Sequence, residues 1–239
     1  MATFVKMILI AGVWTVFFLS SYFLFNSRAE EDMLTLQKAM NQVHMWESYE
    51  SRQSVLLDKE EELHMDSISH QNPYLAQVIA RARLTETEDF KFEVYFQPEV
   101  IYIHTLNKDV WNKTDYTHPA AGDLEGMRDP MAFWLRTLKH ADEIIKEHAV
   151  DGGYHYSITL HPFRDEVHGI HFEDMKAASL EAWVTTAPLR VERMKLVIDF
   201  KPNLLRRYNQ MTYSTEFSSV NRAATITLPK QSASAKKIK

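Results

Sequence analysis

The chain has 239 residues, of which 45% are hydrophobic and 25% charged, and its formal net charge is −5. This is the composition of an ordinary globular protein, and the negative charge argues against a nucleic-acid partner, which selects basic faces. Cysteine is absent, which excludes a lipidated N-terminal cysteine, cysteine-based zinc sites and thiol nucleophiles.

An apolar stretch without charge covers residues 7–25. A helix needs roughly 20 apolar residues to cross a bilayer. We therefore expect residues 1–28 to be an uncleaved, single-pass anchor in the cell membrane, with a cytoplasmic N-terminus and an extracytoplasmic C-terminal domain. A cleaved signal peptide is the alternative, because Ser27 and Ala29 have a possible cleavage spacing, although the apolar run is longer than a typical signal-peptide core.

The first half of the domain combines one helix with several strands. Met33, Leu36, Met40 and Val43 fall near helical spacing and predict a helix over 32–46. Alternating apolar and polar residues predict a strand over 90–97. Further strands are expected at 51–57, 63–68, 75–84, 99–104 and 110–116, followed by a loop over 117–128.

An amphipathic helix is predicted over 129–150. Asp129 can cap its first turn, Pro130 is tolerated there, and Gly152 and Gly153 follow its end. Beyond it, strands are expected at 154–161, 180–186, 191–200, 204–217 and 223–228, while 162–178 is ambiguous. The basic tail over 230–239 is predicted to be disordered.

These elements predict an α+β fold for residues 29–229: one curved, open antiparallel sheet, a half-barrel, covered by helices and preceded by the transmembrane helix. The order of elements resembles the lipoprotein-carrier superfamily, which includes LolA-like proteins and the mycobacterial LppX/LprG type. The resemblance rests on the segment DPMAFWLRTLKHADEII and on the closing strands from Lys195 to Pro229. It implies a bacterial, Gram-positive, membrane-anchored form whose concave apolar face holds acyl chains.

The apolar strand faces are the main candidate site. A curved sheet that does not close leaves an apolar concavity, in which each buried methylene of an acyl chain contributes about 0.8 kcal/mol. The same side chains could instead be packed core beneath the helix over 129–150. The residues expected to line a ligand cavity are Phe92, Phe96, Tyr156, Met194, Ile198, Met211 and Tyr213.

A second candidate is the group of His161, His168 and His171, with His155 nearby and carboxylates between them. Histidine and carboxylate can bind zinc, but the spacing matches no metal-binding motif, so no metal site is predicted. The same histidines could instead sense pH. No nucleophile elbow, phosphate loop or dinucleotide fingerprint occurs, so we expect neither enzymatic activity nor a cofactor.

The sequence thus predicts a membrane-anchored, extracytoplasmic, lipid-binding module that holds a lipid, an acyl group or a lipoprotein between sheet and helix. The alternative is a non-enzymatic protein-interaction or sensor module of a cell-envelope complex. An open apolar cavity would favour the first function, and a filled core with an exposed apolar patch would favour the second.

Overall fold

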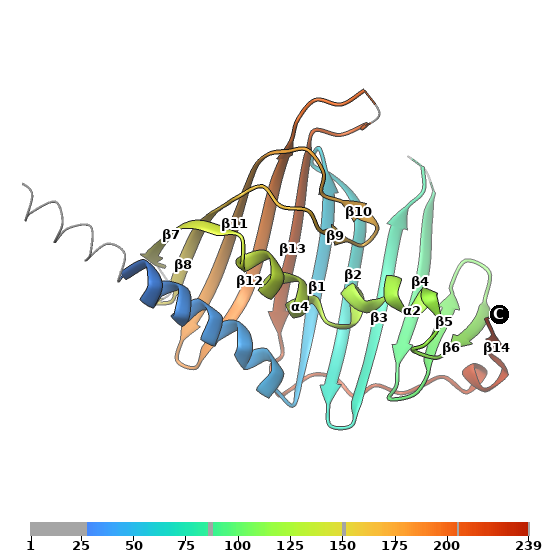
Figure 1. Ribbon diagram of the computed structural model, residues 1–239. Helices are drawn as coiled ribbons and strands as arrows, with labels where there is room; N and C mark the ends of the chain where they lie inside the picture. Colours follow the sequence, from blue (N-terminus) through green and yellow to red (C-terminus); the bar gives the residue numbers. More distant parts are fainter. Residues whose placement is uncertain (1–27, 86–87, 150–151, 205, 239) are drawn as a thin grey trace, which may run out of the picture.

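The computed structural model describes residues 28–85, 88–149, 152–204 and 206–238, so the predicted anchor over 7–25 lies outside the described residues. A single 12-stranded, open and curved sheet dominates the fold (Figure 1). Its strand order is β14-β6-β5-β4-β3-β2-β1-β13-β12-β11-β8-β7. Because β1 pairs with β13, the first six strands and the later ones form one sheet. No helix of the described part is long and apolar enough to cross a membrane.

The strands confirm most of the expected alternation, and all pairings in the large sheet are antiparallel except β14 with β6. Their bounds are β1 (Ser48–Leu57), β2 (Glu60–Gln71), β3 (Tyr74–Arg83), β4 (Asp89–Phe96), β5 (Ile101–Thr105), β6 (Val110–Thr114), β7 (Ala141–His148), β8 (Tyr154–Leu160), β11 (Met175–Thr186), β12 (Leu189–Phe200), β13 (Gln210–Ser218) and β14 (Lys236–Lys237).

A layer of helices and one small hairpin covers one face of the sheet (Figure 1). It consists of a helix over 28–41, η1 (Gln42–Met45), α2 (Pro119–Asp123), α3 (Glu125–Arg128), α4 (Pro130–Leu138) and the hairpin of β9 (Glu166–Val167) and β10 (Ile170–His171). The helix predicted over 32–46 is confirmed. Leu36, Met40 and Val43 are buried, so this helix docks on the sheet.

Two hydrophobic clusters separate the sheet from this layer. The larger one lies on β8, β11, β12 and β13 and includes Trp134 of α4, whose indole stacks on the ring of Tyr213 at 4.8 Å between centroids. The indole nitrogen of Trp134 also donates a hydrogen bond of 3.0 Å to Thr215. The smaller cluster lies on β3, β4 and β5 and includes Met127 of α3. The covering layer therefore packs against the sheet at two places, through Trp134 of α4 and Met127 of α3.

The helix predicted over 129–150 is wrong beyond its first nine residues. Asp129 caps α4 as expected, accepting a hydrogen bond from the Ala132 amide at 3.2 Å, but α4 ends at Leu138. The next residues form β7, which pairs with β8 from Ala141 to His148. Without β7, the amide and carbonyl groups along one edge of β8 would have no strand to pair with. Pairing β7 with β8 forms these backbone hydrogen bonds, and this outweighs the helical spacing of the apolar residues after Leu138.

Two further differences concern the loop before α4 and the C-terminal segment. Residues 117–128, predicted as a loop, contain α2 and α3. Residues 223–228, predicted as a strand, have no regular structure. The tail, predicted to be disordered, forms η2 (Lys230–Ser234) and then pairs with β6 through β14. Ile226 and Ala235 bury against Tyr95 and Trp111, which explains why this segment is fastened to the sheet.

Candidate functional site

A cavity of ≈ 810 Å³ lies between the sheet and its covering layer. Strands β1 to β4 form one wall, and the segment from α2 to α4 together with the β9–β10 hairpin forms the other (Figure 1). Binding sites for small ligands usually have between about 300 and 1,000 Å³. The cavity therefore has the size of a site for a single small amphiphile or part of a larger one.

Apolar side chains line most of this cavity. Those from the sheet are Leu57, Leu63, Ala82 and Phe92, and those from the covering layer are Leu124, Met127, Ala132, Phe133, Val167 and Ile170. The Phe133 ring is held edge-on against Trp134 and Tyr213, at 5.3 and 5.2 Å between centroids. The cavity wall is thus continuous with the larger hydrophobic cluster, which holds it in place.

Charged side chains stand among the lining residues, and most of them are already paired. Arg83 contacts Glu60 at 2.6 Å and Glu62 at 3.9 Å. Arg136 contacts Asp165 at 3.4 Å. Among the described residues that line the cavity, carboxylates outnumber guanidinium groups by five to two. The cavity therefore combines an apolar interior with a polar and predominantly acidic border.

The tip of the β9–β10 hairpin brings one histidine to this cavity. His168 and Gly169 have φ angles of 49° and 80°, as expected for the two central residues of a tight hairpin turn. Both ring nitrogens of His168 are buried, and neither has a hydrogen-bond partner within the described part of the chain. Burial disfavours the charged form and lowers the pKa of this imidazole to about 4. The ring is therefore neutral at pH 7.

The hairpin approaches α3 closely at Gly126. A Cβ atom at Gly126 would lie 3.3 Å from Cε1 of His168, which is tighter than nine in ten real contacts, so a larger residue would have to displace the ring. On its other side the His168 ring meets the Tyr213 ring edge-on at 5.5 Å between centroids. The imidazole is thus held between α3 and β13.

Small buried side chains lie on the middle strands of the sheet. Ser51 and Ser67 are buried side by side on β1 and β2, with their hydroxyl oxygens 2.6 Å apart. Ala76 and Ala80 of β3 are buried in the smaller hydrophobic cluster. These four residues do not line the cavity, whose sheet wall contains Leu57, Leu63, Ala82 and Phe92.

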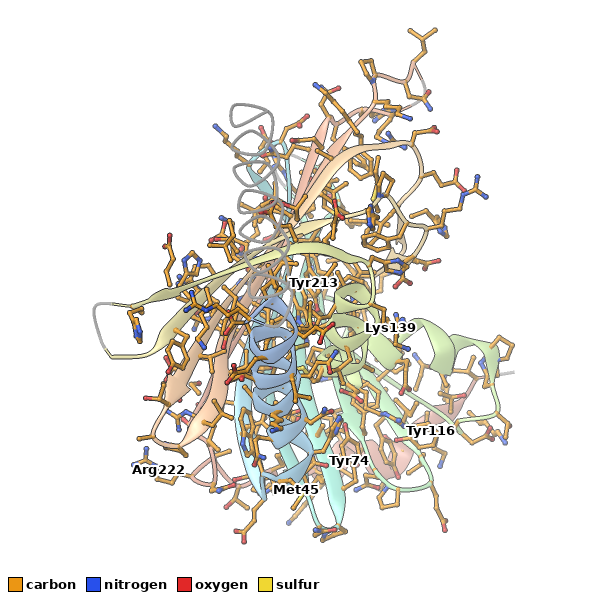
Figure 2. All side chains as sticks on the ribbon, turned by 60° about the vertical axis from the view of Figure 1, so that its left-hand side comes forward. Met45, Tyr74, Tyr116, Lys139, Tyr213 and Arg222 are labelled. Carbon is orange, nitrogen blue, oxygen red and sulfur yellow. The ribbon has the colours of Figure 1, made fainter. Side chains whose placement is uncertain are left out.

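A second cavity, of ≈ 480 Å³, lies between η1 and the α3–α4 junction. Its walls include Tyr49, Tyr74, Tyr116 and Arg128. The Arg128 guanidinium lies over the two rings of Tyr74 and Tyr116, at 5.7 and 5.4 Å from their centroids. Figure 2 shows Tyr74 and Tyr116 in the lower half of the molecule. Asp129 lines both cavities, so the two cavities adjoin at the α3–α4 junction.

The seven residues expected to line a ligand cavity fall in two groups. Phe92 is half-buried and lines the cavity of ≈ 810 Å³. The other six are buried in the hydrophobic clusters: Phe96 in the smaller one, and Tyr156, Met194, Ile198, Met211 and Tyr213 in the larger one. The sequence correctly predicted the side of the sheet to which these residues point. Whether a residue on that side lines a cavity or is packed in the core depends on the position of the covering layer.

The histidines that the sequence groups together are separated in space. His161 pairs with Asp142 at 3.1 Å and His171 with Glu166 at 3.0 Å, and both side chains are exposed. His155 instead stacks on Trp183. In the part of the chain that the structure describes, no group of three histidine or carboxylate side chains could hold a metal ion.

Sequence comparison leaves the chain unassigned: no family model and no curated protein matches it. Among solved structures, the chain is similar to the Mycobacterium tuberculosis lipoprotein LppX, with 10% identity and a TM-score of 0.49 over 82% of this chain and 97% of that one. It is also similar to an uncharacterized conserved protein from Thermus thermophilus, with 10% identity and a TM-score of 0.44 over 87% and 98% of the two chains. At this identity neither match assigns a ligand to this chain.

Proposed function

We propose that this protein is a membrane-tethered, extracytoplasmic module that binds one apolar chain of a lipid, an acyl group or a lipoprotein in the cavity of ≈ 810 Å³. The observation that carries this proposal is the cavity itself, which has an apolar lining and a charged border. Binding requires burial and no covalent chemistry. The uncharged stretch over 7–25 would keep the module at the membrane from which such a ligand comes.

The free energy of such binding can be estimated from the number of methylenes that the apolar lining buries. Each methylene removed from water contributes about 0.8 kcal/mol, so a chain of six buried methylenes gains about 5 kcal/mol before the cost of immobilisation is subtracted. The wall that receives the chain already exists, because the Phe133 ring is held by Trp134 and Tyr213. A wall that needs no reorganisation reduces the cost of binding.

Filling the cavity tests this function. Ala132 lies on α4, is half-buried and lines the cavity, so an Ala132→Trp substitution would place an indole where the ligand chain would lie. The matched control is Ala177→Trp on the exposed face of β11. Binding of a fluorescently labelled monoacylglycerol is then measured with the full chain in amphipol.

Displacing three methylenes from the cavity costs about 2.4 kcal/mol, so Ala132→Trp should weaken binding about fiftyfold, whereas the control should bind like the wild type. Equal binding by Ala132→Trp and the wild type would show that the cavity is not the binding site.

The second candidate is a protein-interaction or sensor module of a cell-envelope complex. A hollow of ≈ 730 Å³ on the uncovered face of the sheet favours it. Ile79 is 48% exposed there, and the Arg193 guanidinium lies 3.7 Å from the centroid of the Trp183 ring. Loss of partner capture by Ile79→Glu, with lipid binding unchanged, would support this candidate.

A further inference from the structure

The cavity holds a polar group that the burial of an apolar chain does not use. The two ring nitrogens of His168 are buried and lack partners among the described residues, although buried polar atoms are normally hydrogen-bonded. Leaving such a group without a partner costs stability, and the side chain lines the cavity. Because both nitrogens have almost no accessible surface, a ligand in the cavity supplies the missing hydrogen bonds when the ring turns toward it.

The protonation state of the ring defines what it can bind. A neutral imidazole has one donor nitrogen and one acceptor nitrogen. A hydroxyl group can satisfy either nitrogen, because it both donates and accepts. A sulfate or a carboxylate can only accept, so it would find one donor and one repelling lone pair on this ring.

The charges around the cavity also disfavour an anionic ligand. The titratable side chains that line it are Glu62, Arg83, Glu125, Asp129, Arg136, Asp165, Glu166 and His168. Both arginines contact carboxylates, at 2.6 Å for Arg83 and 3.4 Å for Arg136, and Glu125 contacts Arg128 at 2.7 Å, so these charges are already compensated. The remaining field is negative and opposes an anionic head group.

From these observations we infer that the cavity selects an uncharged amphiphile that carries a hydroxyl group, such as an acylglycerol, and that His168 hydrogen-bonds this hydroxyl. The inference rests on the proposed function and specifies the ligand class. His168 is then a specificity-determining residue, because it distinguishes head groups, while the apolar wall binds the chain.

The test uses two photoactivatable probes with the same diazirine-bearing chain, a monoacylglycerol and an alkyl sulfate. The sulfate is anionic at every accessible pH. The full chain is held in nanodiscs of phosphatidylcholine, irradiated and digested, and labelling is counted only on peptides that contain residues 57–63, 124–133 or 166–170. This count separates the cavity from any segment of the chain that lies in the bilayer.

We expect the monoacylglycerol to label these peptides at least about fivefold more than the alkyl sulfate, the effect of about one net hydrogen bond. His168→Phe should lower this preference about fivefold, to the part that the negative border of the cavity contributes. His168→Asn keeps a donor and an acceptor and tolerates a positive φ, so it should preserve the preference. His171→Phe, on the exposed side of the same hairpin, is the matched control and should behave as the wild type.

The outcomes separate the two proposals. Equal labelling of the cavity by both probes, or stronger labelling by the sulfate, would overturn the head-group inference and leave the proposed function in place. A preference that is undiminished in a folded His168→Phe variant would overturn the role of His168. If neither probe labels the cavity peptides, the proposed function fails as well.

Discussion

The buried imidazole of His168 makes the stability of the domain depend on pH. In an unfolded chain a histidine titrates near pH 6.5, whereas burial lowers the pKa of His168 to about 4 in the folded protein. Between these values the unfolded state binds more protons than the folded state. The free energy of unfolding therefore falls as the pH falls from 6.5 toward 4, and this histidine has no effect well above pH 6.5.

The size of the effect follows from the two pKa values. The full shift corresponds to about 3 kcal/mol, all of it lost below pH 4. Between pH 7 and pH 5 the same linkage gives about 2 kcal/mol. The His168→Asn substitution removes the titrating group and keeps a side chain that tolerates the observed φ of 49°.

Urea unfolding of the domain that starts at residue 29, followed by tryptophan fluorescence at pH 7 and pH 5, measures this difference. The wild type should lose about 2 kcal/mol more than His168→Asn over this interval. His171→Asn is the control, because the His171 side chain is 70% exposed, and it should follow the wild type. If His168→Asn and the wild type have the same pH dependence, the hairpin tip is not buried as described. An NMR titration that places the His168 pKa near 6.5 would lead to the same conclusion.

Three other substitutions test the packing around the site by urea unfolding. Trp134→Ala removes a fully buried indole and should lower the free energy of unfolding by about 4 kcal/mol; a loss below about 1 kcal/mol would show that α4 is not fastened through this residue. Asp129→Ala removes the cap of α4 and should cost about 1 kcal/mol, whereas Asp129→Asn should cost less. Ile226→Ala should cost about 2 kcal/mol if the C-terminal segment is fastened through its buried side chain. Ile145→Ala, at a position that is 51% exposed, is the control and should stay within about 0.5 kcal/mol of the wild type.

The strands were predictable where one face of a strand is buried and the other is not. In β12 the buried Leu196 and Ile198 alternate with the half-buried Lys195 and Val197, and this period of two was visible in the sequence. The segment after Leu138 was not predictable in this way. Ile144 is half-buried and Ile145 is 51% exposed in an edge strand, so the apolar pattern there fits a helix as well as a strand.

The position of the cavity could not be predicted from the periodicity of apolar residues in the sequence. Phe96 and Met211 were predicted to face the covered side of the sheet, and they do, but helices and neighbouring strands fill the space above them. The cavity lies where Leu63, Ala82 and Phe92 of the sheet meet the covering layer. The hairpin turn at His168–Gly169 lay in a segment without a readable pattern, and only its glycine was a local signal.

The most direct test of the central proposal is native mass spectrometry, with lipid extraction, on the domain from residue 29 purified from a bacterial membrane without detergent. We predict one co-purified amphiphile per chain, and an Ala132→Trp domain that carries none. A wild-type domain that has the mass of the bare chain and takes up neither added monoacylglycerol nor phospholipid would contradict the proposal.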